Sequence, residues 1–175
     1  IELLGLLVDQ VESIFIVDNS DAANDSVYQI VSVGGVALES VRIFRLGDNK
    51  GIAAALNVGL ELAIDEKFDF VLLSDQDSRP APNMLEGLHH AYRELACSGV
   101  KVGAIGPTYT DLYTSRTHGF QAKAGGKLFY ERKVATSEIP NVEALTLITS
   151  GTLIHVDVVR EVGVMREDFF IDHVD

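Results

Sequence analysis

The sequence predicts an α/β domain with a mainly parallel central sheet and helices on both of its faces. Short apolar runs alternate with segments of helical periodicity through the first 106 residues, which is the pattern of a strand–helix–strand fold. Two of these runs end in aspartate, at the edge where open α/β sheets bind their ligands. With 175 residues and 47% hydrophobic content, the chain is long enough to bury one core.

The first part of the chain predicts helices and strands in alternation. Leucine and valine recur at helical spacing at the start, and a second long helical pattern follows Asp48 and Asn49, either of which is a suitable N-cap. Between them lie two compact apolar runs that suit buried strands. The expected elements are a helix at 2–12, a strand at 13–20, a short helix at 27–35, a strand at 41–46 and a helix at 47–67.

The second part begins in the same way and then changes texture after Pro107. A third strand runs into two aspartates and two prolines, and the next helix starts after Pro82 and ends at Gly99. Residues 108–140 are polar and interrupted, so we expect an elaboration of the same domain there. The expected elements are a strand at 70–74, a helix at 83–99, a strand at 100–107, a hairpin or flexible loop at 122–133, a strand at 143–156 and a brief helix at 157–163.

Composition excludes several classes of function. The net charge of −12 argues against nucleic acid as a partner, because its phosphates would be repelled. No apolar run approaches the ~20 residues of a membrane span, and no signal-peptide pattern is present. The single cysteine, Cys97, fits a reducing compartment. We expect a cytoplasmic protein with at most peripheral association at the inner face of a membrane.

Both ends of the chain fall inside patterned segments. Ile1 already belongs to the leucine-rich helical pattern, and Asp175 ends the stretch FFIDHVD without a turn or a polar tail. We therefore expect a domain that is truncated at both ends.

Asp75 and Asp77 raise an electrostatic question, because they follow an apolar strand one residue apart. Side chains two apart on an extended chain share a face, so the two carboxylates would repel each other. A hard divalent cation such as Mg²⁺ or Mn²⁺ removes this repulsion, and it bridges an acidic protein to a diphosphate. The alternative is an Asx turn in which both carboxylates are simply solvated.

Other catalytic motifs are missing from the sequence. There is no G-x-G-x-x-G, no G-x-x-x-x-G-K-[ST] and no G-x-S-x-G, which disfavours dehydrogenase, P-loop and nucleophile-elbow chemistry. Cys97 has no basic neighbour in sequence and is expected to be buried by packing in a helix. The histidines show no convincing metal-ligand spacing.

Five stretches together resemble the inverting family-2-type glycosyltransferases of the GT-A fold, and in particular their rhamnosyltransferase-like members. They occur in the family's order and roughly at its spacing, over nearly the whole chain. The resemblance implies one GT-A domain over 1–175, with a nucleotide-binding half at 1–106 and an acceptor and catalytic half at 107–175. The stretches are IFIVDNS (14–20), NKGIAAALNVGL (49–60), FVLLSDQDSRP (70–80), SGTLI (150–154) and FFIDHVD (169–175).

The resemblance also implies roles in donor binding. Asp18 would accept a hydrogen bond from the imide of a uracil or thymine base; the alternative is a turn-capping aspartate. Asn49, Gly51 and Asn57 would lie near the nucleotide, against the alternatives of helix capping and close packing. Asp75 would lie near the ribose or the metal, and Asp77 would ligate the metal directly. Ser150 and Gly151 would line the donor-sugar or acceptor pocket, unless they only form a tight bend.

Asp175 matches the family's catalytic base, and Asp172 is the reserve candidate. In an inverting transfer this carboxylate takes the proton from an acceptor hydroxyl, which attacks the anomeric carbon opposite the leaving diphosphate. An exposed acidic tail is the alternative for both residues.

The leading hypothesis is a metal-dependent glycosyltransferase that uses Mg²⁺ or Mn²⁺. It would move a sugar, a deoxyhexose such as rhamnose, from a dTDP- or UDP-sugar to a saccharide or lipid-linked saccharide acceptor of a growing surface polysaccharide. One alternative is a phosphatase or phosphotransferase of the haloacid-dehalogenase type, although Arg79 stands where that motif has Thr or Val. Another is a nucleotide-sugar-binding module without turnover.

Overall fold

The computed structural model describes residues 2–21, 40–123 and 130–168, and within them the chain is a mixed α/β structure as predicted. The helix expected at 27–35 lies outside these residues. The elements are α1 (Glu2–Leu7), β1 (Ile14–Asp18), β2 (Val41–Arg45), α3 (Ile52–Asp65), β3 (Phe70–Leu72), α4 (Met84–Cys97), β4 (Ala104–Ile105), β5 (Phe120–Lys123), β6 (Tyr130–Lys133), β7 (Leu153–His155) and α5 (Val156–Val162).

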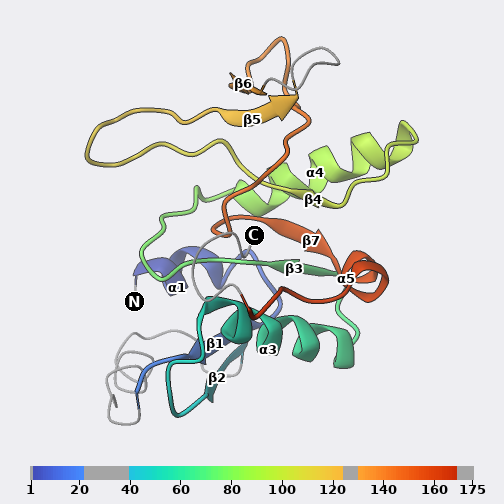
Figure 1. Ribbon diagram of the computed structural model, residues 1–175. Helices are drawn as coiled ribbons and strands as arrows, with labels where there is room; N and C mark the ends of the chain where they lie inside the picture. The colour runs from blue at the N-terminus through green and yellow to red at the C-terminus, as the bar shows by residue number, and fades with distance from the viewer. Residues whose placement is uncertain (1, 22–39, 124–129, 169–175) are drawn as a thin grey trace.

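The described strands form three small sheets (Figure 1). β1 and β2 pair in parallel, in a register that runs from Ile14 opposite Val41 to Asp18 opposite Arg45. β7 lies between β3 and β4 and is antiparallel to both. β5 and β6 pair antiparallel, which confirms the predicted hairpin.

The prediction of a mainly parallel central sheet is therefore wrong for the described strands. β3, α4 and β4 do form a strand–helix–strand unit, and β3 and β4 run the same way because both oppose β7. β7, however, enters directly from a tight turn beside the end of β3, where Gly151 N donates to Leu73 O at 2.8 Å. A parallel strand would have to start at the opposite end of β3, where β3 itself begins. β7 instead starts beside the end of β3 and runs back along it, so the pairing is antiparallel.

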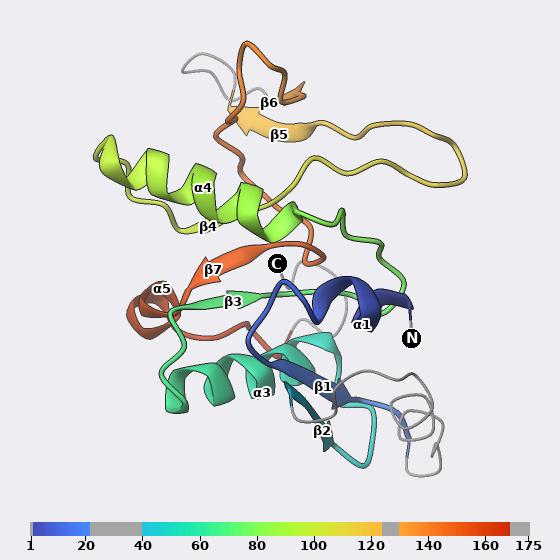
Figure 2. The ribbon, with the colours of Figure 1, turned by 180° about the vertical axis from the view of Figure 1, so that it is seen from behind.

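Helices cover both faces of the β3–β7–β4 sheet, with α3 on one side and α4 on the other (Figures 1 and 2). On the α3 side, Leu60 packs with Leu73, Ile154 and Val159 in the main hydrophobic cluster. On the other side, the Phe70 ring makes edge contacts with aromatic side chains of α4 and β7, Tyr92 and His155. Residues opposite each other in the sheet register share a face, which explains this division.

A second cluster joins α1 to the parallel pair β1–β2. Leu4 of α1 is buried with Val41, and Ile14, Ile16 and Ile43 pack against them. These residues alternate along their strands and therefore lie on one face. No helix within the described ranges has the length and apolar character needed to cross a bilayer.

The predicted N-cap of the helix after β2 is wrong. α3 begins at Ile52, so its N-cap is Gly51, at φ 88° and ψ 161°, and no side chain caps it. Asn49 lies too early in the chain, and its side-chain oxygen accepts a hydrogen bond from Gly51 N at 3.1 Å instead. That bond spans two residues and forms an Asx turn, which sets the loop and leaves the first turn of the helix without a side-chain acceptor.

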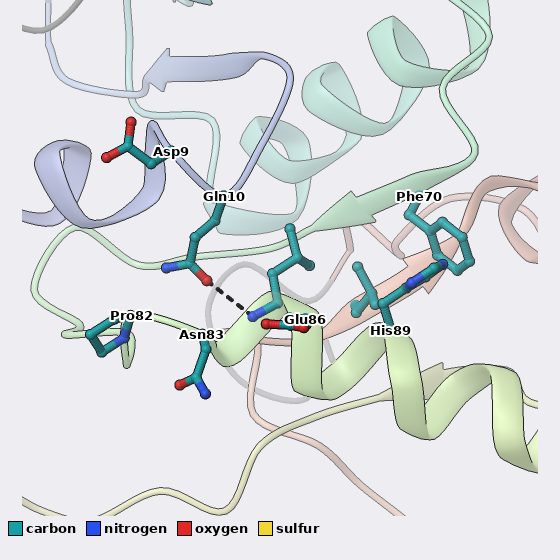
Figure 3. Close-up of a pocket in the computed structure, with 9 residues that line it drawn as sticks. Asp9, Gln10, Phe70, Pro82, Asn83, Glu86 and His89 are labelled. Atoms are coloured by element: carbon teal, nitrogen blue, oxygen red, sulfur yellow. Dashed lines mark hydrogen bonds between the residues drawn. The ribbon is translucent and has the colours of Figure 1, made fainter.

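Helix α4 is capped from a distance by Gln10. Its own N-cap, Asn83, makes no side-chain capping bond. Gln10 follows α1 and accepts from Leu85 N at 3.1 Å, while its amide donates to Ala81 O at 3.1 Å and to Leu6 O at 2.8 Å. Figure 3 shows the bond to Leu85 N across a surface pocket of about 440 Å³. One amide thus joins α1 to the start of α4.

We expect Gln10→Ala to lower the free energy of unfolding by about 1 kcal/mol, because it removes a helix cap and two further bonds. Asn83→Ala, at the nominal N-cap, should change it by less than about 0.5 kcal/mol. Urea unfolding of the two variants measures both values. The reverse order of effects would show that Asn83 is the working cap.

Candidate functional site

Asp18 ends strand β1 as a buried carboxylate. Only 5% of the residue is exposed. Its Oδ1 accepts from Ser20 N at 3.0 Å, in a short turn that follows the strand. Its Oδ2 lies 3.4 Å from Arg45 Nε at the end of β2 and has no hydrogen-bond partner of ordinary geometry among the described residues. A buried carboxylate oxygen in this condition retains the capacity to accept a hydrogen bond.

The surroundings of Asp18 keep it ionised. The hydroxyl and backbone N–H of Ser20 hold its pKa below the ordinary value, and the guanidinium of Arg45 acts in the same direction. Burial opposes these interactions but does not outweigh them. The site therefore presents a buried negative charge that accepts hydrogen bonds at the carboxyl end of a parallel pair.

A network of side-chain amides joins the end of β1 to the start of α3. Asn19 Nδ2 donates to Asn49 Oδ1 at 3.2 Å and to Gly51 O at 3.1 Å. Asn19 Oδ1 accepts from Lys50 N at 2.8 Å. Gly51 is buried and has a positive φ of 88°, a conformation that favours glycine. The predicted pair Asn49 and Gly51 therefore lies beside Asn19, the residue that follows Asp18, in one hydrogen-bonded loop.

Asp75 and Asp77 lie beyond the end of β3, which stops at Leu72. Asp75 is half-buried, whereas Asp77 is exposed and lies in a turn with Gln76. The extended geometry that would place both carboxylates on one face therefore does not continue through this segment. The structure does not by itself bring the pair into a preformed cation cage.

Ser150 and Gly151 form the turn that leads into β7. Thr152 N donates to Thr149 O at 3.1 Å, and Gly151 has a φ of 85°. A Cβ on Gly151 would come within 2.8 Å of Pro107 Cγ, so this position accepts only glycine without rearrangement. The turn is the tight bend given above as the alternative for Ser150 and Gly151.

The same turn holds the loop of the two aspartates in place. Ser150 Oγ accepts from Asp75 N at 3.2 Å and donates to Ser78 Oγ at 2.5 Å. A cavity of about 810 Å³ lies next to this turn, and its lining includes residues of α4 and residues 140–147. Thr149 and Thr152 line it. Three predicted residues, Asp75, Ser150 and Gly151, are thus brought together by hydrogen bonds or by adjacency in the chain.

Asn57 has partners that the sequence did not indicate. It is buried in the middle of α3, and its amide bonds Met165 and Glu167. The only available signal was an asparagine at a core-facing position of a helix, a residue type that helices disfavour there. The sequence also missed Asn19, Ser78 and Arg45, whose roles depend on contacts between distant segments.

The proposed catalytic residues, Asp172 and Asp175, lie outside the described residues. Among the described residues, no cluster of three or more His, Cys, Asp or Glu could hold a metal ion. Two carboxylates from one loop still fit Mg²⁺ or Mn²⁺, because such ions take one or two protein carboxylates and complete their shell with water and substrate phosphates. In chemistry, though not in preformed geometry, the Asp75–Asp77 pair fits such an ion.

Comparison with known proteins supports the resemblance seen in the sequence. The family described as "Glycosyl transferase family 2" matches residues 2–163. A curated relative, the dTDP-rhamnosyl transferase RfbF of Shigella flexneri, is 29% identical over 140 residues, which are 79% of this chain and 45% of that protein. The chain thus spans less than half the length of this relative.

We expect the stability difference between the wild type and Asp18→Asn to depend on pH. The pKa of Asp18 is lower in the folded state than in the unfolded state, so ionisation stabilises the fold above the unfolded pKa. This contribution is lost as the pH falls through the folded pKa. The wild type should be more stable by about 1–2 kcal/mol at pH 7, and the difference should shrink below pH ~4.

Urea unfolding at a series of pH values between 7 and 3 measures this difference. Ser20 N still has an oxygen acceptor in the asparagine variant, so loss of the charge is the main change. A difference that stays constant with pH would contradict an ionised Asp18.

Proposed function

Because this chain belongs to glycosyl transferase family 2, we propose that it is the catalytic domain of a metal-dependent inverting glycosyltransferase of the GT-A fold. The proposed donor is a nucleoside-diphosphate sugar with a thymine or uracil base, and the proposed sugar is a deoxyhexose such as rhamnose. The relative's printed name, a dTDP-rhamnosyl transferase, supports this choice of donor. The acceptor is a saccharide or a lipid-linked saccharide.

The observation that carries the proposal is the buried Asp18 with one oxygen that lacks a hydrogen-bond partner of ordinary geometry among the described residues. A thymine or uracil base has one N–H between two carbonyls, and an ionised carboxylate is a strong acceptor for that N–H. Adenine and guanine present different edges, and cytosine has no such proton. Arg45 Nε lies 3.4 Å from this oxygen without ordinary hydrogen-bond geometry, so the oxygen keeps the capacity to accept from a base that supplies an N–H.

The loop between β2 and α3 suits the rest of the nucleotide. The first turn of α3 has no side-chain cap, so its backbone N–H groups are suited to bind an anion. The buried Gly51 has no side chain to hinder a close approach, and the amide network around Asn19 and Asn49 keeps the loop rigid. These backbone donors would also offset the negative charge of the chain near a diphosphate.

Asp77 and Asp75 would hold the metal ion in this proposal. The bound ion supplies positive charge that stabilises the leaving diphosphate oxygens. The bond from Asp75 N to Ser150 Oγ keeps this loop beside the turn at Gly151. The cavity next to that turn, lined by Thr149 and Thr152, is the proposed acceptor side.

Asp175, with Asp172 in reserve, would act as the general base. The carboxylate takes the proton of an acceptor hydroxyl, the hydroxyl oxygen forms a bond to the anomeric carbon, and the bond from that carbon to the diphosphate oxygen breaks. Attack opposite the leaving group inverts the configuration. Replacement of Asp175 by Asn distinguishes this enzyme from a nucleotide-sugar-binding module without turnover. Only an enzyme has a transferase activity that the substitution can abolish.

We expect dTDP or UDP with Mn²⁺ to raise the melting temperature of the protein. At a nucleotide concentration about 100 times Kd, binding adds ~2.7 kcal/mol, which corresponds to a shift of about 5–10 °C. Asp77→Asn should abolish the part of the shift that requires Mn²⁺, because it removes a metal ligand. Differential scanning fluorimetry with and without Mn²⁺ measures both effects.

Glu61→Gln is the matched control, since Glu61 is an exposed carboxylate on the second half of α3. It should leave the nucleotide shift unchanged. The proposed donor class would be refuted if neither dTDP nor UDP stabilised the wild type at any Mn²⁺ concentration.

A further inference from the structure

Asn57 is a polar side chain in the interior of α3, and only 3% of it is exposed. Asparagine is among the less favourable residues inside a helix, and a buried amide must find partners for two N–H groups and one oxygen. The positions around it that face the core are apolar, as Leu60 and Leu56 show. A leucine would suit this position of the helix better, so helix propensity and apolar packing do not account for an asparagine here.

The amide is fully occupied by a segment more than 100 residues later in the chain. Asn57 Oδ1 accepts from Met165 N at 2.8 Å, and Nδ2 donates to Met165 O at 2.9 Å. Nδ2 also donates to Glu167 Oε1 at 2.9 Å. Two of these bonds mimic a strand pairing with the backbone of Met165. Residues 165–167 are thus fixed in position and orientation against α3.

The contact of Asn57 with residues 165–167, the clamp, lies close to the proposed nucleotide site along the helix axis. Asn57 is five residues after Ile52, which corresponds to a rise of roughly 8 Å at 1.5 Å per residue. The loop of Asn49 and Gly51 is held directly before Ile52. One rigid helix therefore links the proposed donor loop to the segment that precedes the proposed base.

We propose that Asn57 is a positioning residue, which fixes residues 165–167 against α3 and thereby limits the positions open to the proposed base that follows them in the chain. The inference rests on the proposed function, in which Asp175 or Asp172 removes the acceptor proton. Asn57 then acts through Met165 and Glu167 and does not touch the nucleotide. Both of its N–H groups are already engaged, so a direct contact with the nucleotide would require breaking this clamp.

Three variants test this role. Asn57→Asp keeps the oxygen that accepts from Met165 N, but it places a second oxygen against Met165 O and the Glu167 carboxylate. Glu167→Gln keeps an oxygen that can accept from Asn57. The double variant combines the two changes, so the new glutamine amide donates to the new aspartate and restores one of the lost bonds.

The measurements are kcat at saturating donor, the dTDP Kd by calorimetry and the hydrogen exchange of the Met165 amide. We expect Asn57→Asp to lower kcat by about 10- to 100-fold, as displacement of a catalytic group by about 1 Å would. The dTDP Kd should change by less than about 2-fold, and Glu167→Gln alone should lower kcat by less than about 3-fold. The double variant should recover at least about 5-fold of the lost kcat.

Circular dichroism at the assay temperature confirms that each variant is folded. An unchanged kcat in folded Asn57→Asp, or no recovery in the double variant, would overturn the positioning role. A rise in dTDP Kd that matches the loss of kcat/KM would instead make Asn57 a nucleotide contact. A wild type without transferase activity would refute the proposed function and, with it, this role, whereas protection of the Met165 amide reports the clamp independently of activity.

Discussion

Helix α3 packs against both the β1–β2 pair and the β3–β7–β4 sheet and fixes their relative position. The β1–β2 pair and the β3–β7–β4 sheet form no common hydrogen-bond ladder within the described residues, so their relative position depends on side-chain packing. α3 contacts β1 on one side and β3 and α5 on the other. Leu60 is almost fully buried in the main cluster, and Asn57 supplies the polar attachment to residues 165–167. α3 is held at its start, in its middle and on its core-facing side. Because packed helices do not deform continuously, it fixes the distance between the loop before Ile52 and residues 165–167.

The different environments of its carboxylates explain how an acidic chain can be suited to an acidic ligand. The carboxylates of the proposed site have different environments. Asp18 is buried and kept ionised by Ser20 and Arg45, which suits a fixed hydrogen-bond acceptor. Asp77 is exposed in a turn, which suits a ligand to a hydrated ion that arrives with a diphosphate. The two roles need opposite degrees of burial, and the ends of β1 and β3 provide them.

The sequence predicted the local parts of this structure better than the way in which they combine. Strands β1 and β2 and helices α3 and α4 follow from apolar periodicity, which is a local property. The antiparallel entry of β7 depends on a turn at Gly151 that packs against Pro107, and no local pattern encodes that contact. The cap of α4 by Gln10 and the clamp of Asn57 on Met165 connect segments that are 75 and 108 residues apart. Sequence periodicity carries no information about such pairs, although the resemblance placed Asp18, Asn49 and Gly51 near one another.

In the proposed complex, Asp18 accepts one hydrogen bond from the N3–H of the thymine or uracil base of the donor. The most direct measurement compares the affinity of the wild type for dTDP and for its analogue methylated at N3 of thymine, by calorimetry with Mn²⁺ present. The methyl group removes the proposed donor hydrogen and leaves the sugar and the diphosphate unchanged. We expect a loss of about 10- to 100-fold in affinity, which is the value of a hydrogen bond to a charged group. Equal affinities for the two nucleotides would contradict it.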